Sequence, residues 1–497
     1  MRKNKAMKAI SSPPISKGSL VLFCVSAIVL IILIPFDQAA IYLNTYIACS
    51  VLVLACIICP AIFRDSCYSY CNPLTVISCI YGMLFGVCPI YDILTTNYLW
   101  YGYNLFENGL FATLVATIGY LIFVAVYACS AKEVSVSRLF DEGLRESSYT
   151  MPIIVAVYVL SFAANAYYMT ANGGVDLLFT LSLGFLGNGG GEKSEAALGF
   201  ISMFSYCLPA ATLMIIEYGN SRILKAIAVY FMIALQVSRG FRFIIFEIAI
   251  MFLCYYYLKN RKMPNPCLLG SALFLLLGMV LFMTMFRNDI RGGATADLSC
   301  VDFSSLQKSF DEMFWDNLRI YKNFYGMVAA IPAKVPFAYL QQMVIATVVM
   351  VVPRAIWPGK PEYFGVGLDK IIGANFFGTG QAYPNLGEYW YSFGLVAVIF
   401  FMAIYGWWMK RSMIRFGKAG DNISKMALAV LISVNLQLII RGYTPSNFWF
   451  VVFSIAPLYL IGPLCRLFDM RALKKNGCLC ENGKVFRNSD ERCGSDS

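Results

Sequence analysis

Arginine residues recur in short polar segments between the long apolar runs of this chain. A guanidinium group binds phosphate through two parallel hydrogen bonds, so arginine is the side chain best suited to hold phosphorylated ligands. Arginines that converge from separate segments would form a cavity for a phosphorylated or pyrophosphorylated substrate. Those of interest are Arg239 and Arg242 in Ser238–Arg242, Arg287 and Arg291 in Phe286–Gly293, and Arg441 in Arg441–Pro445.

The segment Gly378–Gly394 combines glycine, aromatic and amide side chains. Aromatic rings stack on the apolar faces of sugars and amides hydrogen-bond to sugar hydroxyls, so this combination favours a glycan-binding site. Glu388 lies in this segment, just before a long apolar run. Its carboxylate could accept a proton from a sugar hydroxyl or orient one. The N-terminus of a helix also favours a carboxylate through the helix dipole, which explains Glu388 without a catalytic role.

Histidine is absent from the 497 residues, which removes the commonest general base and metal ligand. Any chemistry must therefore use carboxylates, Arg, Lys, Tyr, Ser or Cys. Most of the 17 cysteines lie inside apolar runs, where cysteine packs as a small hydrophobic residue. Cys478, Cys480 and Cys493 near the C-terminus form no CxxC pair. We therefore expect no metal site and no disulfide framework.

The elements that carry these residues are predicted to be transmembrane helices. Hydrophobic residues make up 59% of the chain and charged residues 13%, whereas soluble domains are about 25% charged. A helix needs about 20 apolar residues to cross the hydrocarbon core. Twelve apolar runs are candidate spans: 20–36, 39–63, 74–91, 109–131, 151–169, 198–216, 223–237, 243–258, 267–286, 389–409, 426–440 and 448–464.

The distribution of basic residues predicts the orientation, because cytoplasmic loops are enriched in Lys and Arg. An inside N-terminus places most basic loops inside, including Lys410–Lys418, and leaves the aromatic stretch Tyr91–Glu107 outside. Both termini are then cytoplasmic. The predicted organisation is a cytoplasmic segment (1–19), nine spans (20–286), a large outer loop (287–388), three spans (389–464) and a cytoplasmic tail (465–497).

The apolar segment Ala338–Pro353 falls within the large outer loop. A full crossing there would move Lys410–Lys418 to the outer side, against the positive-inside rule. We therefore expect a buried or re-entrant helix, since a non-spanning backbone is tolerated at membrane depth where protein covers it. The predicted fold class is all-α and polytopic.

This topology places the arginine clusters at the outer face, where the charge rule does not explain them. A single arginine there could extend to lipid phosphates or pair with an acid such as Asp289 or Glu247. The set as a whole favours an anion-binding cavity.

The order of these motifs resembles that of the O-antigen polymerases, also called oligosaccharide repeat-unit polymerases. The resemblance rests on Ser238–Arg242, Pro353-Arg354 with Trp357–Pro361, Pro384–Glu388 and Tyr391–Gly394 within the predicted topology. It implies a multi-pass enzyme of the bacterial inner membrane that joins undecaprenyl-pyrophosphate-linked repeat units at the periplasmic face. It further implies that no cofactor, nucleotide sugar or metal is required. A chain-length regulator and a flippase are the protein partners that it suggests.

The resemblance also suggests roles for individual residues. Arg239, Arg242, Arg287, Arg291 and Arg441 would stabilise the departing pyrophosphate, because fixed cations do this best when preorganised. Glu388 is the first candidate for the catalytic base and Asp289 the second. The residues expected to hold the glycan or second substrate are Arg354, Lys360, Asn385, Tyr389 and Tyr443.

A flippase, an O-antigen ligase and a membrane acyltransferase are the alternative functions. A flippase for lipid-linked sugars would place charges near the middle of its spans, often in repeated halves, whereas these spans are nearly free of charge. The related O-antigen ligases rely on a periplasmic histidine, and membrane acyltransferases usually depend on histidine as well. The absence of histidine therefore counts against both.

Overall fold

The computed structural model describes the helical part of the chain and two short hairpins. The described residues are 41–63, 71–100, 103–130, 144, 147–171, 203–238, 242–285, 304, 307, 310, 319–350, 352, 357, 382–419, 421–475, 479–481 and 484–486.

Helices dominate the described residues, as predicted. The N-terminal half contains α2 (Ile41–Ile62), α3 (Pro73–Tyr81), η2 (Gly82–Val87), α4 (Cys88–Leu94), α5 (Gly109–Cys129), α6 (Thr150–Ala171), η3 (Phe204–Cys207), α9 (Leu208–Tyr218) and α10 (Arg222–Ser238). The remainder contains α11 (Arg242–Asn260), α12 (Pro266–Met285), α15 (Tyr321–Ala330), η6 (Gln341–Ile345), α16 (Ala346–Met350), α18 (Asn385–Phe393), α19 (Leu395–Ala419), α20 (Asn422–Ser433), α21 (Asn435–Ile440) and α22 (Thr444–Lys475).

Two antiparallel hairpins complete the described elements. One pairs β1 (Leu99–Trp100) with β2 (Tyr103–Asn104), and the other pairs β3 (Leu479–Glu481) with β4 (Lys484–Phe486).

Seven helices in the described part of the chain are long and apolar enough to cross a membrane. They are Tyr42–Ile62, Pro73–Leu94, Gly109–Cys129, Thr150–Tyr167, Phe243–Asn260, Asn422–Ile440 and Thr444–Ala472, and each coincides with a predicted span. Two shorter apolar helices, Phe204–Tyr218 and Pro266–Leu281, fall on two further predicted spans. The chain is therefore an all-α, polytopic membrane protein. The number of crossings stays a prediction, and the predicted span 20–36 lies outside the described residues.

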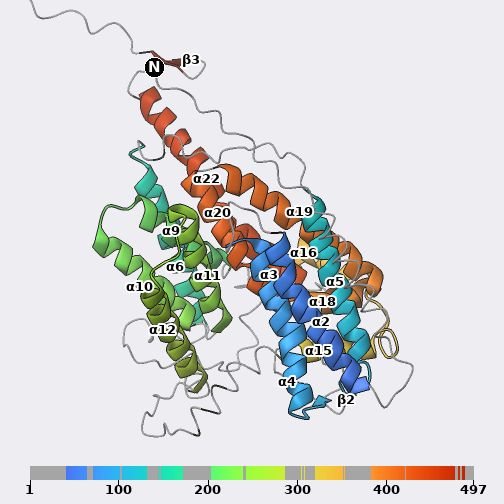
Figure 1. Ribbon diagram of the computed structural model, residues 1–497. Helices are drawn as coiled ribbons and strands as arrows, with labels where there is room; N and C mark the ends of the chain where they lie inside the picture. Colours follow the sequence, from blue (N-terminus) through green and yellow to red (C-terminus); the bar gives the residue numbers. More distant parts are fainter. Residues whose placement is uncertain are drawn as a thin grey trace, which may run out of the picture.

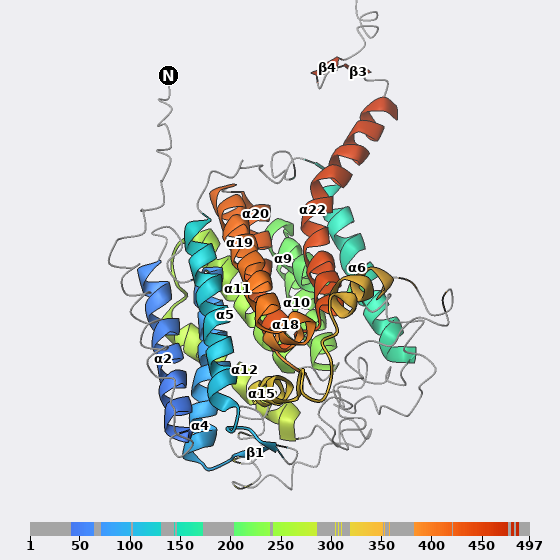
Figure 2. The ribbon, with the colours of Figure 1, turned by 90° about the vertical axis from the view of Figure 1, so that its right-hand side faces the viewer.

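The helices form a bundle with α20 near its centre (Figures 1 and 2). Figure 1 shows α10, α11 and α12 on one side of this centre and α2 to α5 on the other. In the apolar stretch of Asn422–Ile440, 83% of the residues are buried in the protein, against 22% in that of Thr150–Tyr167. Asn422–Ile440, which ends directly before Arg441, is therefore the most enclosed of the seven, and Thr150–Tyr167 leaves most of its surface to the surroundings.

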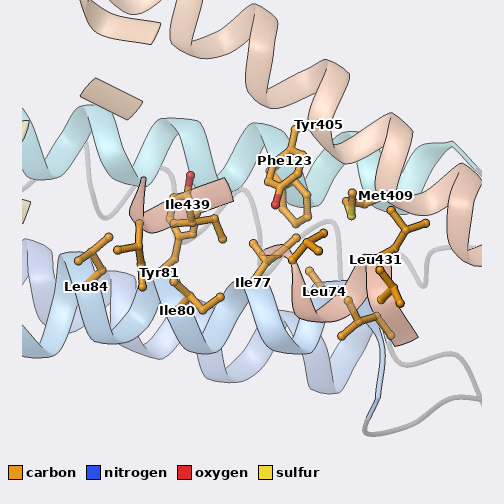
Figure 3. Packing of buried hydrophobic residues seen from close by; sticks show 14 of the residues in the cluster. Leu74, Ile77, Ile80, Tyr81, Leu84, Phe123, Tyr405, Met409, Leu431 and Ile439 are labelled. Carbon is orange, nitrogen blue, oxygen red and sulfur yellow. The ribbon is translucent and has the colours of Figure 1, made fainter. Parts of the chain in front are cut away.

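The core between α3, α5, α19 and α20 is apolar with a few internal hydrogen bonds. Figure 3 shows Ile77 pointing toward Phe123 and Tyr405 of the facing helices and Tyr81 beside Ile439. The Phe123 and Tyr405 rings lie 5.4 Å apart, and Tyr405 donates a hydrogen bond to Asn435 Oδ1. Such side-chain bonds contribute to helix association in lipid, where water offers no competing partners.

The predicted span 389–409 differs from the observed helices. A helix starts four residues earlier, at Asn385, and is interrupted between α18 and α19 at Gly394. Gly394 has φ +64°, a backbone conformation that favours glycine because it lacks a Cβ. The break allows α18, which carries Glu388, to take its own direction at one end of α19.

The segment 338–353 contains only a short helical stretch, formed by η6 and α16. Ten helical residues rise about 15 Å, half of the ~30 Å hydrocarbon core. Whether the segment re-enters or spans the membrane stays a prediction. The Trp449 indole N–H donates to Thr347 O at 3.0 Å, which fastens α16 to α22.

Candidate active site

Two of the predicted motifs meet where the turn between α21 and α22 packs on the N-terminus of α18. The Gly442 N–H donates to Tyr383 O at 2.7 Å. A Cβ on Gly442 would lie 2.5 Å from the backbone N of Asn385, far closer than carbon atoms approach. Only glycine permits this contact, which brings the Arg441 turn directly against the segment that carries Glu388.

Glu388 is buried at this junction, with 1% of its surface exposed. Its Oε1 and Oε2 accept the Thr444 N–H at 3.0 and 2.9 Å, and Oε2 accepts the Thr444 hydroxyl at 2.6 Å. The carboxylate therefore binds the first residue of α22, a position that the helix dipole favours. Glu388 lies outside the seven candidate spans. Burial raises the pKa of Glu388 to about 8, although the Thr444 hydrogen bonds oppose the rise.

The neighbouring glycan-binding candidates face the bundle. Asn385 is buried, and its Oδ1 accepts the Tyr81 hydroxyl at 3.1 Å. The Tyr389 ring stacks on Phe401 with centroids 5.1 Å apart. Tyr443 is half-buried and packs against the main hydrophobic core. These side chains shape the junction from within, and their predicted contact with a glycan stays a prediction.

Arg441 lies beside the first turn of α11. Its guanidinium carbon is 4.7 Å from the centre of the Phe243 ring, within the range of a cation–π interaction. Phe243 directly follows Arg242, the first residue of α11. The backbone of Arg441 is also held, because the Asn447 side chain donates to its carbonyl oxygen. The structure thus brings the Arg441 turn next to the end of Ser238–Arg242.

Glu247 approaches the same arginine from one turn further along α11. It is four residues after Phe243, so the two side chains share a helix face. Glu247 is 5% exposed and interacts electrostatically with Arg441. Its Oε1 is buried without a hydrogen-bond partner in the described part of the chain. Glu247 lines a cavity of about 30 Å³ together with Ser433 and Ser454, which is large enough for water.

A buried charged cluster that the sequence did not suggest connects the large loop to α4. The Asp92 carboxylate is 0% exposed. It receives the Lys322 ammonium at 3.0 Å, the Arg319 Nε at 3.2 Å and the Tyr321 hydroxyl at 2.6 Å. More than two hundred residues separate Asp92 from these partners, so nothing in the local sequence pairs them. The cluster fixes the start of α15 against the spanning helices.

The remaining site predictions are only partly reached by the structure. Arg242 is described as backbone alone, at the start of α11. Six predicted residues lie outside the described part of the chain: Arg239, Arg287, Asp289, Arg291, Arg354 and Lys360. No group of three or more Cys, Asp or Glu residues that could hold a metal ion occurs within the described ranges.

The structure defines a polytopic helical bundle in which Glu388, Glu247 and Arg441 come from separate helices or turns that pack on one another. Residues 19–470 match the family model described as O-antigen polysaccharide polymerase Wzy. The match covers most of the chain, which therefore belongs to this family. Proteins of the family polymerise lipid-linked O-antigen repeat units, so the chain is a membrane glycosyltransferase of the polysaccharide polymerase type. No curated protein and no solved structure matches it.

Proposed function

We propose that this polymerase acts at the periplasmic face of the bacterial inner membrane on repeat units carried by undecaprenyl pyrophosphate. The proposed orientation follows the positive-inside rule, which places Lys410–Lys418 in the cytoplasm and the Arg441 turn outside. The junction of Glu388, Arg441 and Thr444 is then at the face where the substrate is presented.

The proposed reaction is a single glycosyl transfer. A hydroxyl oxygen of the acceptor unit forms a bond to the anomeric carbon of the growing glycan. The bond from that carbon to the carrier pyrophosphate breaks, and the pyrophosphate leaves with the electron pair. A base takes the hydroxyl proton. The two requirements on the protein are therefore fixed positive charge for the leaving group and a carboxylate near the acceptor.

The contact between Arg441 and Phe243 is the observation that carries the proposal. It supports the proposal because the guanidinium of Arg441 contacts the ring of Phe243, the residue that directly follows Arg242, although about two hundred residues separate the two arginines in the chain. Arginines from separate helices that approach one another in this way suit the binding of a pyrophosphate, because each can donate two parallel hydrogen bonds. Arg239, Arg287 and Arg291 are proposed to complete the cavity.

Glu388 is the proposed base, with Asp289 as the second candidate. The support for Glu388 is its position one helical turn after Asn385 in α18. The backbone of Asn385 contacts Gly442, the residue that follows Arg441. Its present hydrogen bonds to Thr444 would have to loosen for it to receive a proton from a sugar. Arg354, Lys360, Asn385, Tyr389 and Tyr443 are proposed to hold the acceptor or the glycan.

Reconstitution tests the proposal most directly. The purified full chain in detergent, supplied with repeat units on a lipid pyrophosphate and no nucleotide sugar or metal, should produce a ladder of longer glycans. If the units instead cross the membrane of liposomes without being extended, the protein is a flippase and the proposal fails.

Substitution of the arginines tests the site within the cell. Arg239→Ala and Arg287→Ala should each abolish long-chain polysaccharide at a normal protein level, because the leaving pyrophosphate loses its counter-charge. Arg471→Ala is the matched control, since Arg471 is exposed on the last turns of α22. Full-length chains on a glycan gel in both variants would contradict the arginine site.

A further inference from the structure

A groove runs between α19, α20 and α22, and neither the proposed reaction nor its site uses it. Its volume is about 740 Å³, within the range of ~300–1,000 Å³ that accommodates ligands of substantial size. The walls are mainly apolar and include Trp407 and Trp408 of α19, Leu431 of α20 and Val451 of α22. A groove of this composition suits a hydrocarbon chain.

Two arginines are the charged residues of this groove. Arg411 and Arg415 both come from α19 and line it together with the apolar residues. The guanidinium carbon of Arg411 lies 5.3 Å from the centre of the Trp407 ring. The Nε of Arg415 is buried and has no hydrogen-bond partner among the described residues. A buried donor of this kind requires an acceptor. Because the guanidinium group is positively charged, an anionic group next to the apolar walls is the acceptor that suits it.

The groove lies away from the candidate active site along the helix axis. Sixteen residues separate Leu395, at the start of α19, from Arg411, which corresponds to about 24 Å of helix. Glu388 and Arg441 lie beyond the opposite end. In the proposed orientation, Arg411 and Arg415 are therefore at the cytoplasmic headgroup level, and the apolar walls reach toward the middle of the bilayer.

The groove also opens toward the side of the bundle that lipid would cover. Trp407 is 46% exposed and Leu460 is 54% exposed, and both line the groove. Large apolar side chains exposed at membrane depth face acyl chains rather than water. A lipid can therefore enter from the side, with its chain along the walls and its phosphate at the two guanidinium groups.

We infer that this groove binds one anionic phospholipid of the membrane, held by its acyl chain and by its phosphate at Arg411 and Arg415. Charge complementarity selects an anionic headgroup, because a zwitterionic lipid offers the two arginines no net negative charge. Basic pockets between transmembrane helices on the cytoplasmic side bind anionic headgroups in this way. The inference stands apart from the polymerase site, since the two use different residues, which lie beyond or toward opposite ends of α19.

Tryptophan fluorescence provides the test, because Trp407 and Trp408 line the groove. The purified full chain in detergent is titrated with phosphatidylglycerol that carries brominated acyl chains, or with phosphatidylcholine that carries the same chains. Phosphatidylglycerol should quench the fluorescence at lower concentration. The double variant Trp407→Phe, Trp408→Phe should lose this additional quenching, which assigns it to the groove among the 7 tryptophans.

The arginine variants separate charge from fold. Each basic residue contributes about fivefold in affinity for an anionic lipid, so Arg411→Gln should weaken binding about fivefold and Arg411→Gln with Arg415→Gln about thirtyfold. Arg471→Gln, exposed and outside the groove, should change nothing. Arg411 is itself exposed, so its single variant keeps the test valid if the double variant fails to fold.

Three results would overturn the inference. One is equal quenching by the two brominated lipids, and another is quenching of Arg411→Gln at the same phosphatidylglycerol concentration as the wild type. The third is displacement of the bound lipid by undecaprenyl phosphate at a much lower concentration than by phosphatidylglycerol, which would assign the groove to the carrier lipid instead.

Discussion

At the scale of single residues, the ionisation of Glu388 governs its use as a base. Burial raises the pKa of Glu388 to about 8, so the carboxyl is mainly protonated at neutral pH and a base must be deprotonated. The rate of polymerisation below pH 8 should therefore rise about tenfold per pH unit and level off above it. Initial rates of glycan extension between pH 6 and 9.5 measure this, and Glu388→Gln should be inactive throughout. A flat profile in the wild type would remove Glu388 from the proton transfer.

Glu247 allows a second prediction, on the positioning of Arg441. Glu247→Gln keeps the size of the side chain and removes the charge that faces the guanidinium. The KM for the lipid-linked repeat unit should rise about tenfold, because contacting residues couple by about 0.5–3 kcal/mol. In an Arg441→Gln background the same substitution should have little further effect. If the effect is as large without Arg441, Glu247 contributes only to the packing of α11.

Residue types and order in the chain were enough to single out both segments of the junction. Glu388 and the Arg441 turn are predicted site residues because a carboxylate and an arginine border apolar runs. The structure brings the segments that carry them into contact at Gly442 and Asn385. The bond between Glu388 and Thr444 could not be foreseen, because capping of a different helix leaves no local pattern. Asp92 and Lys322 were missed for the same reason, since each alone resembles an ordinary charge near the end of an apolar run.

At the scale of elements, the Asp92 cluster holds α15 to α4. Removing one partner of a buried ion pair leaves an uncompensated charge and costs about 3–5 kcal/mol. Asp92→Asn should therefore lower the melting temperature of the purified protein markedly, because Lys322 is 2% exposed and would stay buried without its carboxylate. Thermal unfolding in detergent measures the shift. As a comparison, Glu107→Gln, at an exposed position after the β1–β2 hairpin, should leave the melting temperature unchanged. Equal melting temperatures for both variants would show that the cluster does not stabilise this contact.

Hydropathy predicts the extents of the helices well, but it does not predict where a helix is interrupted. The run 109–131 became a helix over Gly109–Cys129 and the run 426–440 one over Asn422–Ile440, because about 20 apolar residues are what a bilayer demands. The break at Gly394 depends on a positive φ. Glycine permits that angle without requiring it, so an apolar run containing glycine does not reveal where a helix bends.

At the scale of the whole molecule, both proposed sites depend on which end of the bundle faces the periplasm. The β1–β2 hairpin and α15 lie at one end of the bundle, and the far end of α22 extends from the other (Figure 2). Glu388 and Arg441 lie nearer the first end than Arg411 and Arg415, because α19 runs from Leu395, next to α18, toward the second end. The positive-inside rule makes the first end periplasmic, because Lys410, Arg411, Arg415, Arg466 and Arg471 all gather toward the second.

Reporter fusions test this orientation of the protein in the membrane. Alkaline phosphatase needs disulfides, which form in the periplasm and not in the cytoplasm, so it should be active when inserted after Glu107, at the exposed end of the β1–β2 hairpin. A fluorescent protein that folds in the cytoplasm should fluoresce when fused after Ser497. Insertion of the phosphatase after Asp421, which caps the start of α20, is the matched control and should be inactive. Activity at Asp421 with none at Glu107 would invert the molecule. The junction of Glu388, Arg441 and Thr444 would then face the cytoplasm. The groove at Arg411 would lie in the leaflet in which the repeat units are presented.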